Sequence, residues 1–210
     1  MATATRIETA HGLCSIVDLT DDAIIDALAA LPAREQAFAA TLSDVRRRDL
    51  IVGRTALHDA LAQLEPSLAG AAILADDRGA PMLPAGWVGS VSHKGTRAAA
   101  LVSRDHGARV GIDLELAVAP RQDIATRILT LREQQALLDR GTGTTLRFSI
   151  KEAIYKAIDP YVRRYVAFTE VELDVAEGIA HVTSTLDLDI DTTWRELDGH
   201  WLATARATRR

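Results

Sequence analysis

The sequence predicts an α+β fold built from two halves. Stretches with the alternating apolar pattern of strands and stretches with helical apolar spacing are mixed within each half. The chain is 48% hydrophobic and 25% charged, which is ordinary for a globular protein that buries a core. We place the boundary near residue 105, which gives an N-terminal lobe of residues 1–104 and a C-terminal lobe of residues 105–210.

The elements of the first half follow from apolar spacing and from turn residues. Thr20 precedes two acids and starts a helix, and Pro32 ends that helix and opens another. Leu50, Leu57, Leu61 and Leu64 mark the buried stripe of a longer helix that Ser43 caps. The ranges expected are strands at 13–19, 71–75 and 87–92, and the long helix at 44–64.

In the second half we expect a hairpin, helices and a final sheet. The hairpin joins 98–103 to 109–116 around Arg104–Gly107. Thr130 and Glu133 form a capping box, and Asp159-Pro160 ends the last helix. The ranges expected are helices at 121–129, 131–140 and 145–158, and strands at 170–175, 179–184, 194–197 and 200–207.

The composition of the chain argues against nucleic acid and membranes as binding partners and indicates the cellular compartment. The net charge of −5 gives no support for nucleic-acid binding, and no apolar run is long enough to span a membrane. Cys14 is the single cysteine, so an internal disulfide is excluded and a reducing compartment is expected. Residues 1–11 lack the layout of a signal peptide. We therefore expect a cytoplasmic protein.

Residues 110–115 combine a buried strand pattern with two carboxylates. Val110 and its alternate neighbours form an apolar face, while Gly111, Asp113 and Glu115 share the other face, with open space beside Asp113. Such a pair of acids can hold Mg²⁺, or it can lie on a solvated edge. These six residues alone favour the solvated edge.

The helix at 145–158 carries a second acidic element. Its apolar residues, Ile150 and Ile154 among them, face the core, and Ser149, Glu152 and Lys156 cluster on the opposite side. Glu152 and Lys156 stand four residues apart, so an exposed salt bridge explains them equally well.

Arginines gather on the helix at 44–64. Arg54 and Arg47 fall beside the leucine stripe, and Arg48 points to the opposite side. A guanidinium in that position can bind a phosphate, or it can pair with an acid such as Asp44 or Asp59. The two interpretations are evenly balanced.

Together these groups resemble a known family. Three carboxylates, two lysines, a Ser-His pair and flanking arginines form a coherent metal and phosphate site. The sequence from Gly111 to Glu115, followed by 148–157, resembles the two signatures of 4′-phosphopantetheinyl transferases, and the likeness extends over 30–175. Gly89–His93 and Gly53-Arg54 resemble further motifs of the monomeric surfactin-type and enterobactin-type group.

The resemblance implies two similar lobes about a pseudo-two-fold axis, with coenzyme A between them, and it implies a monomer. It implies transfer of 4′-phosphopantetheine from coenzyme A to a serine of an apo acyl or peptidyl carrier protein of fatty acid, polyketide or nonribosomal peptide synthesis, with Mg²⁺, or Mn²⁺ in its place, and 3′,5′-ADP as product. The implied metal ligands are Asp113, Glu115 and Glu152, and the implied catalytic residues are Glu152, Lys156 and Asp113. The implied coenzyme A ligands are Arg47, Arg54, Arg78, Ser92, His93, Lys151 and Lys156.

The chain departs from the family at two places. Gly79-Ala80-Pro81 stands where a Gly-Lys-Pro motif is usual, so Arg78 is the candidate for the missing charge. Lys94 follows the Ser-His pair where small residues are usual. Two other functions remain open: a non-catalytic module that binds coenzyme A or a nucleotide, and a Mg²⁺-dependent hydrolase that acts on a pyrophosphate.

Overall fold

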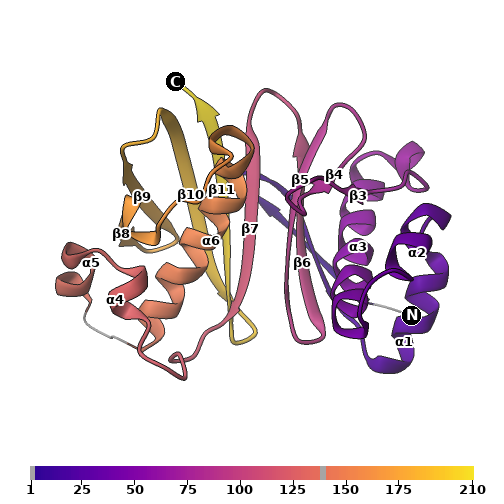
Figure 1. The fold of residues 1–210 in the computed structure, drawn as a ribbon, viewed down its shortest axis with the longest axis horizontal. Coiled ribbons are helices and arrows are strands. Elements are labelled where there is room, and N and C mark those ends of the chain that lie inside the picture. Colours follow the sequence, from indigo (N-terminus) through magenta and orange to yellow (C-terminus); the bar gives the residue numbers. More distant parts are fainter. Residues whose placement is uncertain (1–2, 138–140) are drawn as a thin grey trace. The chain divides into compact units, whose positions relative to one another are not determined.

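The computed structural model describes residues 3–137 and 141–210. The chain divides into two compact units, Met1–His106 and Gly107–Arg210. Both contain helices and strands, as the predicted α+β class requires (Figure 1). We describe each unit by itself.

The first unit is a four-stranded antiparallel sheet with helices against it. The sheet order is β1-β2-β6-β5, and α3 lies along it, against β2, β5 and β6 (Figure 1). Its strands are β1 (Thr3–Thr9), β2 (Gly12–Asp18), β5 (Trp87–Lys94) and β6 (Arg97–Arg104). The remaining elements are α1 (Asp21–Ala30), α2 (Ala33–Ala39), α3 (Asp44–Leu64), the 3-10 helix η1 (Pro66–Leu68), and the short pair β3 (Leu74–Ala75) and β4 (Pro81–Met82). The sequence prediction missed β1.

The core of this unit lies between α3 and the sheet. The buried side of α3 includes Ile51, Leu57 and Leu61, whereas Leu64 is exposed. The predicted stripe is therefore wrong at its C-terminal end. Gly53 faces β5 so closely that an added Cβ would lie 3.0 Å from Val91 Cγ2, which explains why this helix carries glycine at its centre.

The predicted hairpin between 98–103 and 109–116 is wrong. β6 pairs with β5 and β2, while the following strand, β7 (Arg109–Leu116), belongs to a different sheet and pairs with β11 (His200–Arg209). The hairpin of this region is instead β5–β6, which turns at Gly95 with a φ of 63°.

The second unit is a five-stranded antiparallel sheet in the order β7-β11-β10-β9-β8, with α6 packed against β7 and β11 (Figure 1). The other strands are β8 (Val171–Ala176), β9 (Ile179–Ser184) and β10 (Leu188–Leu197). The helices are α4 (Ala125–Ile128), α5 (Leu131–Ala136), α6 (Thr142–Val162) and the 3-10 helix η2 (Phe168–Glu170). Residues 138–140 of the predicted helix 131–140 lie outside the described residues.

The central helix α6 is longer than predicted at both ends. It passes through Pro160 and ends at Val162, and the capping residue Arg163 adopts the left-handed conformation with a φ of 48°. Proline lies in the last turn, where the loss of a single backbone donor interrupts the helix less than it would at the centre. Ile150, Ala153, Ile154 and Ala157 are buried, as their spacing predicts.

The capping box predicted at Thr130 is confirmed. The Thr130 hydroxyl accepts from the Glu133 backbone, and the Glu133 side chain accepts from the Thr130 N–H. None of the described helices is both long enough and apolar enough to cross a membrane.

Candidate functional site

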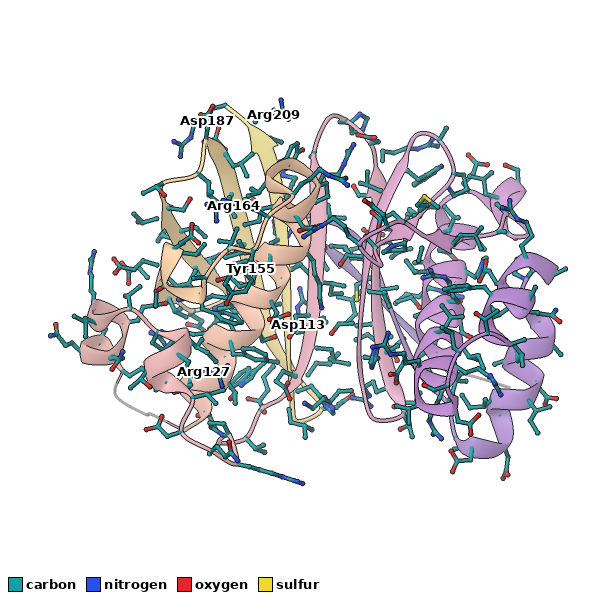
Figure 2. All side chains as sticks on the ribbon, in the orientation of Figure 1. Asp113, Arg127, Tyr155, Arg164, Asp187 and Arg209 are labelled. Atoms are coloured by element: carbon teal, nitrogen blue, oxygen red, sulfur yellow. The ribbon has the colours of Figure 1, made fainter. Side chains whose placement is uncertain are left out.

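The candidate site of the second unit lies where α6 meets β7. Gly111 makes this contact possible, because a Cβ at that position would lie 1.9 Å from the Ala153 carbonyl oxygen. The open space expected beside Asp113 is therefore absent, since the backbone of α6 fills it. This close approach brings side chains of the helix to the acidic face of the strand, where Asp113 lies (Figure 2).

Asp113 has partners on α6. Its Oδ2 accepts a hydrogen bond of 2.9 Å from the Ser149 hydroxyl, and its Oδ1 accepts one of 2.9 Å from the Lys156 ammonium. Lys156 also donates to the Ile112 carbonyl at 2.8 Å. Asp113 is 6% exposed, and Ser149 is fully buried, so the side of the helix on which Ser149 was expected to cluster with Glu152 and Lys156 is covered at Ser149.

Glu152 shares the electrostatic field of the two carboxylates on β7. Burial raises the pKa of Glu152; the charge of Lys156 opposes this rise, and the charges of Asp113 and Glu115 add to it. Since Lys156 forms its ion pair with Asp113, a simple salt bridge between Glu152 and Lys156 on the helix surface does not describe this region. Lys156 instead links α6 to β7.

The fit of these residues to Mg²⁺, which the resemblance implies, rests on donor chemistry. Among the described residues, no three His, Cys, Asp or Glu side chains are arranged closely enough to hold a metal ion as they stand. Carboxylate oxygens are nevertheless the ligands that Mg²⁺ prefers, and Asp113 already holds a cation, the Lys156 ammonium. Asp113, Glu115 and Glu152 therefore suit a hard divalent cation in donor type and charge.

Lys151, expected among the coenzyme A ligands, has all three of its donors used inside the unit. The ammonium donates to Glu133 Oε2 at 2.7 Å, to the Ile128 carbonyl at 2.8 Å and to the Phe168 carbonyl at 2.9 Å, and the side chain is fully buried. Burial lowers the pKa of Lys151, and the Glu133 carboxylate opposes that shift. Lys151 thus connects α4, α5 and η2 to α6.

An aromatic group next to Glu152 escaped the sequence prediction. Tyr155 lies on α6 (Figure 2), and its ring centroid is 5.0 Å from that of Phe168, which in turn lies 5.7 Å from that of Phe148. The Tyr155 hydroxyl is buried and has no hydrogen-bond partner in the described part of the chain, and burial raises its pKa. The seven-residue spacing of Phe148 and Tyr155 was the available signal, since it places both on one side of a helix.

In the first unit, Arg54 lies in a buried polar cluster. Its Nε is 3.9 Å from Glu35 Oε2, and the two side chains are 5% and 1% exposed. Burial lowers the pKa of Arg54, and the charge of Glu35 opposes that shift. Asp44 and Asp59 were the partners considered from the sequence. Neither pairs with Arg54, but Asp44 does pair with Arg47, whose Nη1 lies 3.4 Å from Asp44 Oδ1. The sequence prediction did not include Glu35.

The other arginines of the prediction are placed differently. Arg47 donates to the Ala39 and Leu42 carbonyls at 3.0 Å each, which closes the loop before α3. Arg48 pairs with Asp21 on α1. Arg78 is exposed and lies in a turn where Asp76 accepts from its backbone N–H at 2.8 Å.

Ser92 and His93 lie near the end of β5. Ser92 is 7% exposed, whereas the His93 side chain is 43% exposed, with Nδ1 3.4 Å from Asp49 Oδ1 on α3. Strand alternation gives the two neighbours opposite faces, so their surroundings differ. The next residue, Lys94, is the last of the strand and is half-buried.

Comparisons with known proteins cover both units. The family model of the 4′-phosphopantetheinyl transferase N-terminal domain matches residues 33–103, and that of the 4′-phosphopantetheinyl transferase superfamily matches residues 109–207. 4′-Phosphopantetheinyl transferase Npt of Nocardia iowensis is 35% identical over 160 residues, which cover 73% of this chain and 70% of the relative. The chain belongs to the 4′-phosphopantetheinyl transferase superfamily.

Two further relatives of this superfamily member align over shorter spans. 4′-Phosphopantetheinyl transferase PptT of Mycobacterium tuberculosis is 34% identical over 61% of this chain and 58% of the relative. Enterobactin synthase component D of Escherichia coli is 40% identical over 37% of this chain and 39% of the relative. The superfamily match includes β7 and α6, and therefore Asp113 together with Ser149, Glu152 and Lys156.

Proposed function

We propose that this protein transfers the 4′-phosphopantetheine group of coenzyme A to a serine of an apo acyl or peptidyl carrier protein. The serine oxygen forms a bond to the β-phosphorus, the one that carries pantetheine. The bond from that phosphorus to the bridging oxygen breaks, and 3′,5′-ADP leaves. Such a transfer depends mainly on positioning and on stabilisation of charge.

One observation carries the proposal: Asp113, Ser149 and Lys156 meet at a strand–helix contact, beside Glu152, within the region that matches the superfamily. The exposed-edge interpretation predicts a solvated Asp113, but Asp113 is 6% exposed. A carboxylate that is buried against a serine and a lysine is a functional-site candidate on physical grounds, because its burial is costly.

The proposed roles in the second unit follow from charge. Mg²⁺ held by Asp113, Glu115 and Glu152 would neutralise the pyrophosphate. Glu152 accepts the proton of the serine hydroxyl, for which a carboxyl group with a raised pKa is suited. Lys156 binds the pyrophosphate and stabilises the charge of the departing group. Lys151 is outside this set, because its three donors are used inside the unit.

In the first unit, we propose that Arg54 binds the 3′-phosphate of coenzyme A, and that Ser92 and His93 contact phosphate. The guanidinium fork suits a phosphate, and the serine hydroxyl and the imidazole can each donate to phosphate oxygen. Arg78 is exposed and stays the candidate for the positive charge that the Gly-Lys-Pro motif would supply. Arg47 is a weaker one, because two of its nitrogens already donate to carbonyls.

The experiment is intact-mass measurement of several apo carrier proteins after incubation with this protein, coenzyme A and Mg²⁺. We expect one added 4′-phosphopantetheine group on a carrier, and no addition when a chelator removes the metal. Glu152→Gln keeps the size of the side chain and loses the base, so coenzyme A binding should survive while transfer fails.

The other two functions give different results in the same assay. A binding module would retain coenzyme A without turnover in every reaction. A hydrolase would release 4′-phosphopantetheine into solution and leave the carriers unmodified. Transfer by Glu152→Gln at close to the parent rate would show that the proposed mechanism is wrong.

A further inference from the structure

A buried cluster of charged groups surrounds Arg54 in the first unit. Glu35 lies on α2, and Arg54 and His58 stand one turn apart on α3, where they face it. Arg54 and Glu35 are 4% and 1% exposed, so this charge pair is almost fully removed from water. A buried ion pair contributes little to stability unless hydrogen bonds satisfy both partners.

Only one side of the Glu35 carboxylate is satisfied. Oε1 accepts a 2.6 Å hydrogen bond from the Ile73 N–H and lies 2.8 Å from His58 Nε2. Oε2 is buried and has no hydrogen-bond partner among the residues that the structure describes. Glu35 is thus anchored through one oxygen, and the other is left facing Arg54.

Arg54 is held by charge and not by hydrogen bonds. The distance of 3.9 Å from its Nε to Glu35 Oε2 exceeds the hydrogen-bonding range, and no other described residue offers this buried Nε a hydrogen-bond partner. Within residues 3–137 and 141–210, its two terminal nitrogens donate no hydrogen bond either. The guanidinium therefore keeps its donors uncommitted beside a fixed negative charge.

Unused hydrogen-bond donors on Arg54 would lower stability if the Arg54–Glu35 pair were only structural, but they would favour the binding of an anion. Unmade hydrogen bonds of a buried arginine lower stability. An anion that reaches the guanidinium would use those donors, and a guanidinium held in advance loses less freedom on binding than one in solvent.

We propose that Glu35 is the positioning residue of Arg54, and that His58 holds Glu35 in place, so that this cluster sets the preference of the protein for coenzyme A with its 3′-phosphate. The inference rests on the proposed function of Arg54. A purely structural role would change stability and affect ligands with and without the 3′-phosphate alike.

The test is the affinity of the full-length protein for coenzyme A and for 3′-dephospho-coenzyme A, by calorimetry. We expect the parent to prefer coenzyme A and Arg54→Ala to lose that preference. Glu35→Gln should reduce the preference about tenfold, the loss expected from one misaligned charge-assisted hydrogen bond. In the Arg54→Ala background, Glu35→Gln should have no further effect on the preference.

Two controls separate position from charge. Glu65→Gln removes a negative charge from a partly exposed pair with Arg104 in the same unit and should leave the preference unchanged. Arg48→Ala removes an arginine of the same helix that pairs with Asp21 and should also leave it unchanged. If Glu35→Gln does not fold, His58→Gln replaces it, with an expected reduction of about threefold, since His58 acts one contact further away.

The outcomes distinguish the inference from the function on which it rests. If the parent shows no preference for coenzyme A, both the role of Arg54 and the inference are wrong. If Arg54→Ala loses the preference but folded Glu35→Gln and His58→Gln keep it, only the inference is wrong. If Glu35→Gln lowered the affinity for both ligands equally, the inference would also be wrong, and the cluster would have a structural role only.

Discussion

The missing side chain of Gly111 decides how closely α6 approaches β7. An added Cβ would collide with the Ala153 carbonyl oxygen and would lie 2.8 Å from the Ala157 nitrogen, and both of these are backbone atoms that cannot rotate away. The hydrogen bonds that Asp113 accepts from Ser149 and Lys156 depend on this same contact.

Gly111→Ala should lower the free energy of unfolding by about 1–3 kcal/mol, because the helix must shift away from the strand. Urea unfolding followed by circular dichroism measures it. Gly70→Ala is the matched control, since apart from Gly70 and its chain neighbours no described atom lies within 4 Å of a Cβ built there, and its change should stay below about 0.5 kcal/mol. Equal unfolding midpoints for the two variants would contradict the close contact.

At Asp113 we predict an effect on activity with little loss of fold. Asp113→Asn keeps the shape and the hydrogen bond from Ser149 but removes the charge that pairs with Lys156 and the ligand proposed for Mg²⁺. Transfer should fall by about a hundredfold or more, as expected for loss of a group that stabilises the transition state. The rate of carrier modification over a Mg²⁺ titration measures it.

Asp187→Asn is the control for Asp113→Asn, because Asp187 is exposed on the same unit (Figure 2). It should modify carriers at the parent rate. If folded Asp113→Asn did the same at limiting Mg²⁺, Asp113 would have no part in metal binding.

At the scale of elements, the buried ion pair of Lys151 and Glu133 connects helices and a strand of the second unit that are far apart in the sequence. Glu133 accepts from Lys151 and, through Oε1, from the Leu173 N–H at 3.2 Å, so α5, α6 and β8 meet at one buried carboxylate. The sequence suggested a phosphate ligand at Lys151, because a lysine beside a motif glutamate gives no sign of its own burial.

Lys151→Met should reduce the free energy of unfolding by about 3–5 kcal/mol, because it leaves the Glu133 carboxylate buried and unpaired. Arg132→Met breaks an ion pair with Glu172 in which the arginine is 75% exposed, and it should cost less than about 1 kcal/mol. Chemical denaturation of both variants measures the difference. Similar losses of unfolding free energy in the two variants would mean that the buried pair stabilises the fold no more than the exposed one.

Asp59 on α3 ties the helix to two strands. It accepts from Arg6 on β1 at 2.6 Å and from Ser15 on β2 at 2.7 Å. Burial alone would raise the pKa of Asp59, but the hydrogen bonds from Arg6 and Ser15 hold it below its usual value. The carboxylate form therefore stabilises the folded unit.

The stability that Asp59 contributes is present above the pKa of the carboxyl group in the unfolded chain, and it is lost as pH falls through the lower pKa of the folded protein. Asp59→Asn should thus be less stable than the parent at neutral pH, and the two should converge in acid. Unfolding experiments over a pH series measure this. Asp18→Asn, which breaks an exposed pair with Arg97, is the control and should show a smaller difference at neutral pH.

The sequence predicted local elements well and their partners poorly. The buried residues Ile150 and Ile154 follow from helical spacing, which is a local property. The partner of β7 is β11, about ninety residues further along the chain, and no local pattern identifies it. The nearest strand was therefore chosen wrongly.

The same limit applies to the candidate site. Asp113, Glu152 and Lys156 were chosen from motif chemistry, but the pairing of Lys156 with Asp113 instead of Glu152 depends on how α6 lies on the sheet. Glu35 was missed because an acid in a short amphipathic helix normally faces solvent, and only the tertiary structure shows that it is buried.

For the whole molecule, the two units have separate hydrogen-bonded sheets. The sheet of the first unit is formed within Met1–His106 and that of the second within Gly107–Arg210, and each has a core of its own. A unit with its own sheet and core can fold alone.

We therefore predict that the fragments 1–106 and 107–210, produced separately, each unfold cooperatively on heating. Circular dichroism melts with the intact chain as reference measure this. A cut within the first unit, between α3 and β5, is the control, because it separates the two sides of one core and should leave fragments without a cooperative transition. Gradual melting of both 1–106 and 107–210 would contradict the independence of the cores.

The contiguity of the units has a consequence for how the protein is made. The last strand of the first sheet, β6, ends at Arg104, so every strand of that sheet has been synthesised before the ribosome begins the second unit. At roughly 5–20 residues per second, the second half takes several seconds to emerge, whereas small domains fold within that time. Because the first unit is synthesised first, its core can fold before the apolar strands of the second unit have been made. This order limits mispairing between the two sheets during translation.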